Sequence, residues 1–400
     1  MRYLHIISSA QAERALQAVG VDFPGIGAML PKMETVNLLL EGIECKVANI
    51  LKQEMLSAGG DVAVARGSVS CSIDRTDAII IGTLKQVGRL AEKISSQPFG
   101  LSNISEDIKK ILANIKRNTF LLRTPKRDIE AGERTLVMGI LNMTPDSFSD
   151  GGMFGSIDEA AEYALALEEA GADILDIGGE SSRPGSLPVS SEDELERVVP
   201  LIRRLEKVLS IPISIDTTKA DVALRAIESG AEMVNDISAM RFDPKMPEVI
   251  AGCRVPVVLM HMRGVPETMQ EGDLEYRSLM GEITDFLKER IETAQLSGID
   301  SENIIVDPGI GFGKSTADNI AILKHLRELK ALGRPIMVGT SRKRFIGEIE
   351  GEKLPAGRVA GTAASIAVSI MNGADIVRVH DVDFMKRVSL IIDEIKECQA

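Results

Sequence analysis

The chain has 400 residues, 44% of them hydrophobic, and a mean hydropathy of +0.07, so it can bury a sizeable core and is not expected to be disordered. Its formal net charge of −13 at pH 7 repels nucleic-acid phosphates and anionic lipids, so we expect neither nucleic acid nor a membrane as a partner. The four cysteines are far apart, with no metal-ligand spacing, which predicts reduced thiols in a cytoplasmic protein.

The first third of the chain alternates short apolar segments with amphipathic ones and predicts a small α/β domain over residues 1–118. We find in it no phosphate loop, metal cluster or nucleophile arrangement, so an interaction or stabilising module is the hypothesis for its role. The first ten residues contain too short an apolar run for a secretory signal. The expected strands are 3–7, 36–40, 62–65 and 78–81, and the expected helices are 10–19, 44–58, 84–96 and 106–116.

The second domain, residues 119–400, begins with two short strands at 120–123 and 127–131, interpreted as a hairpin that plugs a barrel. Eight β-branched runs follow, each succeeded by a helical pattern, which favours a closed (β/α)₈ barrel over an open sheet. The expected strands are 136–143, 174–179, 213–216, 233–238, 257–262, 304–309, 336–341 and 376–381. The expected helices are 158–170, 192–209, 220–229, 244–253, 276–296, 317–330, 358–371 and 383–397.

Every predicted barrel strand ends in polar or charged residues. In this fold the carboxyl ends of the strands converge on one face, where the following loops build the active site. Some of these residues could instead cap helices, but eight ends of eight are difficult to explain by capping alone. The residues are Asn142, Glu180, Asp216, Asn235 with Asp236, His261, Asp307, Ser341 with Arg342 and Lys343, and Arg378 with His380.

Two loops after the first strands carry candidate ligands. Asn142 begins a long polar loop and could offer an amide oxygen to a hard cation, although a lone Asn is more often a turn residue. Arg183 stands before Pro184 and Gly185, where a guanidinium could bind an anion with two hydrogen bonds; the alternative is a surface ion pair.

The segment DPGIGFGKS after Asp307 is similar to a phosphate-binding loop but does not meet the pattern. Pro308 stands where a Walker loop requires Gly, and the dinucleotide pattern lacks its third Gly. What remains is Phe312 between glycines on a loop that follows a carboxylate, which suits a flat aromatic substrate.

Cations gather at the ends of the last two strands. Arg342, Lys343 and Arg344 follow the seventh strand, and Arg378 and His380 stand at alternate positions of the eighth, so these two point the same way. This region is a frequent phosphate site in barrels. The residues alone thus indicate a pocket with a phosphate side and, at Asp216, Asn235 and Asp307, an acceptor side for a heterocycle rich in N–H groups.

Taken together and in this order, the segments resemble the dihydropteroate synthases of folate biosynthesis over about residues 120–400. The motifs that carry the resemblance are MGILNMTPDSFSDGG, DIGGESSRPG, SIDT, VNDI, DPGIGFGKS, SRKRFIG and RVHD. The resemblance implies a homodimeric barrel transferase that requires Mg²⁺. It would condense 6-hydroxymethyl-7,8-dihydropterin pyrophosphate with p-aminobenzoate, and sulfonamides compete for the second site in this family.

The resemblance also assigns roles to residues. Lys343, Asp307 and Asn142 are implied as catalytic, with Asn142 the Mg²⁺ ligand. Asp216, Asn235 and Asp307 would hold the pterin with Lys343 beside them, and Arg378, His380, Asn142 and Arg183 would bind the pyrophosphate. The p-aminobenzoate site would be formed by Phe148, Ser182, Pro184, Phe312 and Lys343.

Two positions depart mildly from commoner family forms, Ser182 in place of Thr and Arg344 in place of Ser. We expect His380 to bind phosphate rather than act as a general base, since an aniline nitrogen loses its proton readily after attack. The alternatives are a methyltetrahydrofolate:corrinoid methyltransferase, which would have no use for the cation cluster, and a non-catalytic pterin-binding protein.

Overall fold

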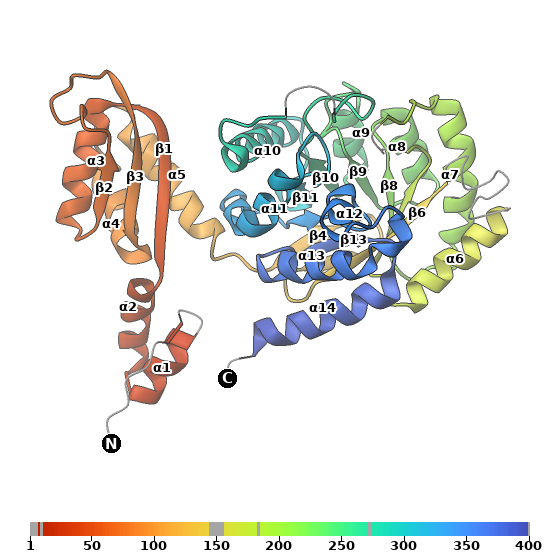
Figure 1. Cartoon of the computed structure of the whole chain (residues 1–400), viewed down its shortest axis with the longest axis horizontal. Helices are drawn as coiled ribbons and strands as arrows, with labels where there is room; N and C mark the ends of the chain where they lie inside the picture. The colour runs from red at the N-terminus through yellow and green to blue at the C-terminus, as the bar shows by residue number, and fades with distance from the viewer. Residues whose placement is uncertain (1–6, 9–10, 144–155, 182–184, 271–273, 399–400) are drawn as a thin grey trace. The chain divides into compact units, whose positions relative to one another are not determined.

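The structure is a computed structural model that describes residues 7–8, 11–143, 156–181, 185–270 and 274–398. The chain forms two compact units, Met1–Lys116 and Arg117–Lys396 (Figure 1). None of the helices formed by the described residues is long and apolar enough to cross a membrane.

The first unit contains a three-stranded antiparallel sheet in the order β1-β3-β2. Side chains alternate across the sheet: Val62, Ala78 and Ile80 are buried in the core that the helices share, whereas Leu39 and Ile79 are exposed on the other face. The elements are α1 (Ala12–Val19), α2 (Phe23–Met33), β1 (Thr35–Glu44), α3 (Cys45–Ser57), β2 (Asp61–Val64), β3 (Arg75–Thr83), α4 (Leu84–Ile94) and α5 (Leu101–Asn114).

Helix α2 was not predicted from the sequence. It contains Pro24, Gly25 and Pro31, which are poor helix formers, but Pro24 lies in the first turn, where no backbone N–H is needed, and Asp22 caps the helix by accepting from Gly25 N at 2.9 Å. The strand expected at 3–7 lies almost wholly outside the described residues.

The second unit is a parallel (β/α)₈ barrel, as predicted. Its sheet runs in the order β11-β10-β9-β8-β7-β6-β13-β12, and a bridge between Val306 and Ile336 joins the two ends. The strands are β6 (Leu136–Asn142), β7 (Ile174–Gly178), β8 (Ile213–Asp216), β9 (Met233–Asp236), β10 (Val257–Met260), β11 (Ile304–Asp307), β12 (Met337–Val338) and β13 (Ile376–Val379).

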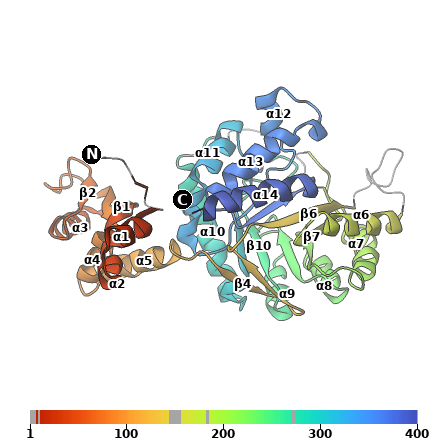
Figure 2. The same cartoon turned by 90° about the horizontal axis from the view of Figure 1, so that it is seen from below.

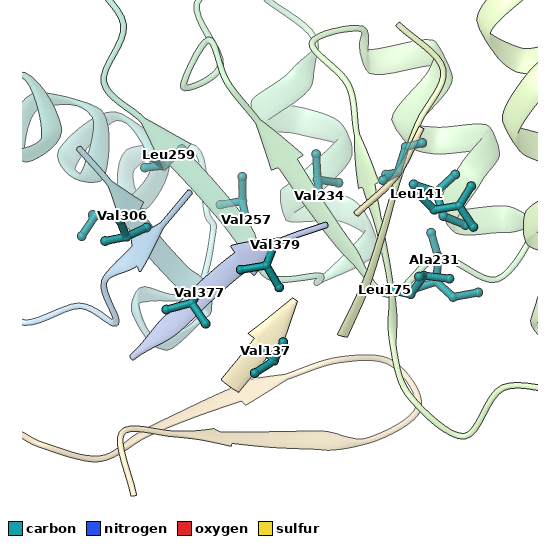
Figure 3. Packing of buried hydrophobic residues seen from close by; sticks show 14 of the residues in the cluster. Val137, Leu141, Leu175, Ala231, Val234, Val257, Leu259, Val306, Val377 and Val379 are labelled. Carbon is teal, nitrogen blue, oxygen red and sulfur yellow. The ribbon is translucent and has the colours of Figure 1, made fainter. Parts of the chain in front are cut away.

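Helices cover the outside of this barrel (Figures 1 and 2). Side chains on the outer face of the strands, such as Val137, Leu175 and Val377, belong to the large core shared with the helices (Figure 3). The helices are α6 (Ile157–Glu169), α7 (Ser191–Leu205), α8 (Ala220–Glu228), α9 (Met246–Cys253), α10 (Leu279–Leu296), α11 (Thr316–His325), α12 (Arg344–Glu350), α13 (Val359–Met371) and α14 (Val382–Glu397).

One helical prediction needs correction, and one helix was not predicted. The helix expected over 317–330 ends as an α-helix at His325 and continues as the 3₁₀ segment Leu326–Leu332. Helix α12, which begins at Arg344 after the seventh strand, was not predicted from the sequence.

A hairpin of β4 (Phe120–Arg123) and β5 (Asp128–Ala131) fills the amino-terminal end of the barrel. Its apolar side chains form one cluster with the first inward-facing residues of the strands, including Ile174 and Ile376. Because successive strand residues alternate between faces, the residues two positions later on each strand also point inward. The hairpin therefore closes the apolar end, and the polar residues that follow line the open one.

Candidate active site

Strand register places the predicted residues along one rim of the barrel. Asn142 pairs with Gly178, Gly178 with Asp216, and Asp216 with Asn235. On the same rim Met260 of β10 pairs with Asp307 of β11. Neighbouring strands lie about 4.8 Å apart, so Asn142, Asp216, Asn235 and Asp307 lie along one rim of the mouth, with Gly178 and Met260 at the intervening strand ends.

An ion-pair network connects this arc to β13. Arg378 donates from Nε to Asp176 Oδ2 at 2.6 Å and from Nη2 to Asp216 Oδ2 at 2.6 Å. Asn235 Nδ2 donates to the same oxygen of Asp176 at 3.0 Å. Four strands, β7, β8, β9 and β13, are thus joined across the barrel interior by four side chains.

Asp176 was not predicted from the sequence. It lies in the middle of the apolar strand β7 and is fully buried, so nothing at a strand end indicated it. The available signal was the strand period: Asp176 is two residues after Ile174, which points into the barrel.

Several polar atoms of this network, and one of Ser214 next to Asp176 in the strand register, are buried without a hydrogen-bond partner among the described residues. They are Oδ1 of Asp176, Oδ1 of Asn235 and Oγ of Ser214. Buried acceptors are normally satisfied, and each one left unpaired costs free energy, so these three indicate a place where a polar ligand binds.

Burial changes the acid–base state of the carboxylates. It raises the pKa of Asp216 to about 7; Arg378 opposes this shift, and the neighbouring Asp176, Glu194 and Asp236 add to it. Burial also raises the pKa of Asp307 to about 6, against the hydrogen bond from Gly309 N and the charges of Lys343, Lys314 and Arg378. The pKa values of both carboxylates at the mouth of the barrel are therefore raised above that of a solvated aspartate, with burial as the main cause.

The loop after β11 brings Asp307, Phe312 and Lys343 together. Asp307 Oδ1 accepts from Gly309 N at 2.6 Å, and Lys343 Nζ lies 4.2 Å from the centre of the Phe312 ring. Phe312 is buried in a cluster with Ile237 and three methionines of β10 and the loop that follows it. A cation above an aromatic ring beside a buried carboxylate suits a flat, polar heteroaromatic ligand.

The cations after β12 are not equivalent. Arg342 is held by Asp381, from Nε at 3.0 Å and Nη2 at 2.6 Å, and Arg344 is exposed and paired with Glu348 on α12. Arg342 and Arg344 are therefore engaged in ion pairs, whereas Lys343 is directed to the Phe312 ring. Arg378 is likewise engaged with carboxylates rather than standing alone at a phosphate site.

His380 lies at the end of β13, where its Nδ1 is 3.0 Å from Ser341 Oγ. Burial, with the charges of Arg378 and Arg342, lowers the pKa of His380 to about 3. The ring is therefore neutral at pH 7 and can donate only through one N–H.

A cavity of about 240 Å³ opens beside Asp216, lined by the loops that follow β7, β8, β9 and β10. Phe148, Ser182, Arg183 and Pro184 lie outside the described residues. No group of three or more His, Cys, Asp or Glu side chains that could hold a metal ion occurs among the residues the structure describes.

Residues 138–380 match the family described as pterin binding enzyme. The dihydropteroate synthase of Synechocystis is 50% identical over 264 residues, which cover 66% of this chain and 91% of that protein. The chain belongs to the dihydropteroate synthase family.

A dihydropteroate synthase from Xanthomonas albilineans, solved with 4-aminobenzoic acid, has a TM-score of 0.65 at 44% identity and covers 70% of this chain and 99% of that one. The family match extends from β6 to His380 and includes every candidate residue named above. A probable bifunctional folylpolyglutamate synthase/dihydropteroate synthase from Halobacterium salinarum is 40% identical over 371 residues. That match covers 93% of this chain, so it includes most of the first unit, but only 44% of the relative.

Proposed function

We propose that this chain transfers the exocyclic CH₂ of 6-hydroxymethyl-7,8-dihydropterin pyrophosphate to the amine of p-aminobenzoate, forming 7,8-dihydropteroate and releasing pyrophosphate. The observation that carries the proposal is the buried set of acceptors on β7, β8, β9 and β11. Asp176 and Asn235 each present an oxygen with no partner among the described residues, and a pterin ring carries N–H groups that would satisfy them. The relative solved with 4-aminobenzoic acid supports the second substrate.

In this proposal Asp216, Asn235 and Asp307 hold the pterin ring. Asp307 accepts a hydrogen bond from Gly309 N through Oδ1, which leaves Oδ2 to accept from the ligand. The ring would stand between the methionines of β10 and the loop that follows it and the network of Arg378. Because this part of the site is fixed by strand backbone, it requires little rearrangement to bind.

Bond cleavage separates the CH₂ carbon from the pyrophosphate oxygen, and the electron pair leaves with that oxygen. Arg378, His380, Asn142 and Arg183 would stabilise the negative charge of the leaving group. The electron-rich ring can delocalise the positive charge left on the CH₂, which favours a dissociative path. The amine nitrogen then forms the new C–N bond and releases its proton, so no strong base is needed.

Asn142 fits a magnesium site of the kind completed by substrate. Mg²⁺ is commonly held by one or two protein oxygens together with phosphate oxygens and water. Asn142 is at the strand end next to Gly178, where a Cβ would come within 3.6 Å of the Asn142 amide oxygen. When bound there, the ion would neutralise charge on the leaving pyrophosphate.

The aromatic amine would lie against Phe312 and Lys343. The resemblance adds Phe148, Ser182 and Pro184 to this part of the site. Since the Lys343 ammonium already faces the Phe312 ring at 4.2 Å, it can also attract the carboxylate of the amine substrate.

We further propose that the enzyme is a cytoplasmic homodimer. Exposed apolar side chains gather on α13 and α14, which lie side by side in both views of the chain (Figures 1 and 2). They are Val368, Met371, Phe384, Leu390, Ile391 and Ile395. For the two domains, residues 1–118 and 119–400, we propose that catalysis resides in the second and that the first is an interaction or stabilising module.

The test is pyrophosphate release when the full chain is mixed with the pterin pyrophosphate, p-aminobenzoate and Mg²⁺. We expect release to depend on both organic substrates and to be lost in Asp307→Asn. Transfer of a methyl group without pyrophosphate release would support the corrinoid methyltransferase alternative. Binding of pterin without turnover would support a non-catalytic protein.

A further inference from the structure

Lys314, at the end of the loop that follows β11, is buried with only 2% of its surface exposed. Among the described residues, no carboxylate lies within ion-pair distance of its ammonium. Instead, Nζ has three acceptors, which are His261 Nδ1 at 2.9 Å, His261 O at 3.2 Å and Phe312 O at 3.0 Å. An ammonium group has three donors, so every one of them is used.

His261 is arranged to receive this contact. An ammonium has no lone pair, so Nδ1 accepts and the ring is neutral with its proton on Nε2. Burial and the positive charges of Lys314 and Arg241 lower the pKa of His261, which agrees with a neutral ring. The ring is fixed edge-on against Phe286 of α10 at 5.0 Å, and His261 N donates to Asp307 O at 2.9 Å. The acceptor thus belongs to the rigid end of β10.

Four carbonyl groups of the loop that contains Phe312 accept hydrogen bonds. Gly309 O accepts from Phe312 N, Gly311 O from Gln270 and Gly313 O from Tyr276, while Phe312 O accepts from Lys314. Of these four donors, Lys314 Nζ is the charged one, and it belongs to the loop itself. Burial lowers the pKa of Lys314 to about 7 while Asp307 opposes the shift, and the three acceptors favour the protonated form.

The backbone conformation of the same loop is tightly constrained. Gly309, Gly311 and Gly313 are in the left-handed region, with φ of 69°, 81° and 63°. A Cβ on Gly309 would lie 1.9 Å from His261 O, and one on Gly313 would lie 2.6 Å from Arg263 O. The loop backbone therefore rests directly on the segment after β10, at the place where Lys314 joins the two.

We propose that Lys314 is a positioning residue that clamps the backbone of Phe312 to the end of β10 and so sets the wall against which the aromatic amine stacks. It acts through Phe312 and Lys343, whose ammonium lies 4.2 Å from the Phe312 ring. The inference rests on the proposed function, since it concerns the amine side of that reaction. A lysine that only stabilised the fold would affect both substrates alike.

The experiment compares Lys314→Met with Lys386→Met in the full chain. Lys386 is also largely buried, but it pairs with Asp173 at the amino-terminal end of the barrel, so its variant controls for lost stability. We expect Lys314→Met to raise KM for p-aminobenzoate about tenfold, the value of one well-placed aromatic contact. KM for the pterin pyrophosphate should stay within a factor of about three. Lys386→Met should lower Tm and change neither KM.

Two further variants complete the test. Lys314→Gln retains donors for two of the three acceptors and should restore part of the KM for the amine. If Lys314→Met does not fold, His261→Phe keeps an aromatic ring against Phe286 and removes both ring nitrogens, including the Nδ1 that accepts from Lys314, and it should raise the same KM. Equal increases in both KM values, or none, would overturn the inference, provided that the wild-type chain releases pyrophosphate. Absence of release by the wild type would instead refute the proposed function.

Discussion

Arg378 and Asp176 form an ion pair inside the barrel, with Nε 2.6 Å from Oδ2 and the carboxylate fully buried. The second Asp176 oxygen has no partner among the described residues. The pair therefore holds a cation close to the substrate position while leaving one acceptor for a ligand.

Replacing Asp176 with Asn tests this relationship. The change leaves Arg378 with Asp216 as its remaining partner and removes one charge from the network. We expect kcat/KM to fall by about 100-fold, since removing one partner of a buried pair costs roughly 3 kcal/mol and part of that cost falls on the site. Steady-state kinetics and thermal unfolding measure the two effects.

Glu232→Gln is the matched control for that variant. Glu232 is a buried carboxylate paired with Arg127 at 3.0 Å, at the opposite end of the barrel. It should lower Tm and leave kcat/KM within about twofold of the wild type. Equal losses of activity in both variants would mean that Asp176 acts through stability alone.

Asp307→Asn is expected to lose activity and to be more stable than the wild type at high pH. The pKa of Asp307 is raised to about 6, so its stabilising contribution is present at low pH and is lost as pH rises through about 6. The variant should therefore be more stable than the wild type by about 2–3 kcal/mol at pH 8 and equal to it near pH 4. Denaturant unfolding at the two pH values, with pyrophosphate release measured in parallel, checks both parts.

Asp173→Asn should behave in the opposite way. Burial raises the pKa of Asp173, but the hydrogen bonds from Arg134, Val137 N and Lys386 outweigh burial, and the net shift is downward. Its contribution is present at neutral pH and is lost on acidification, so this variant should be less stable than the wild type at pH 8, with a difference that shrinks at low pH. The same pH trend in both variants would refute the assignment.

His380→Gln tests the role of the ring at the end of β13. With its pKa lowered to about 3, His380 is neutral between pH 5 and 8 and would bind pyrophosphate as an uncharged donor. We expect the variant to bind pyrophosphate about fivefold more weakly, as for one neutral hydrogen bond, with no pH dependence of that difference over the range. Calorimetry with pyrophosphate measures it, whereas intact binding with abolished turnover would identify His380 as a general base.

The barrel was predictable from the sequence because each strand is a short β-branched run that ends in a polar residue, as at Ile213–Asp216, whose bounds agree with the prediction. Asn142, Asp216, Asn235 and Asp307 were found because parallel strands bring their carboxyl ends to one rim.

A sequence pattern does not show which ion pairs its charged residues form in the folded protein. Arg342 and Arg378 are equally cationic in sequence, yet one is held by Asp381, the next strand's end, and the other lies between two carboxylates from distant strands. Asp176 was not predicted because a fully buried carboxylate inside an apolar strand is explained only by its ion pair with Arg378 across the barrel. The sequence places Lys314 only in a segment similar to a phosphate loop, because its contact with His261 joins residues 53 positions apart.

The proposed homodimer can be tested at Ile391 of α14. Ile391 is 62% exposed, on the same stripe as Phe384 and Ile395, while Met385 on the inner stripe is fully buried. Ile391→Glu would place a charge in the apolar interface, so light scattering should show half the wild-type mass at micromolar concentration. Leu296→Glu is the control, because Leu296 is 90% exposed at the end of α10, away from the proposed interface, and its replacement should leave the mass unchanged. A wild-type chain that is already monomeric, or an Ile391→Glu variant that keeps its mass, would contradict a dimer through α14.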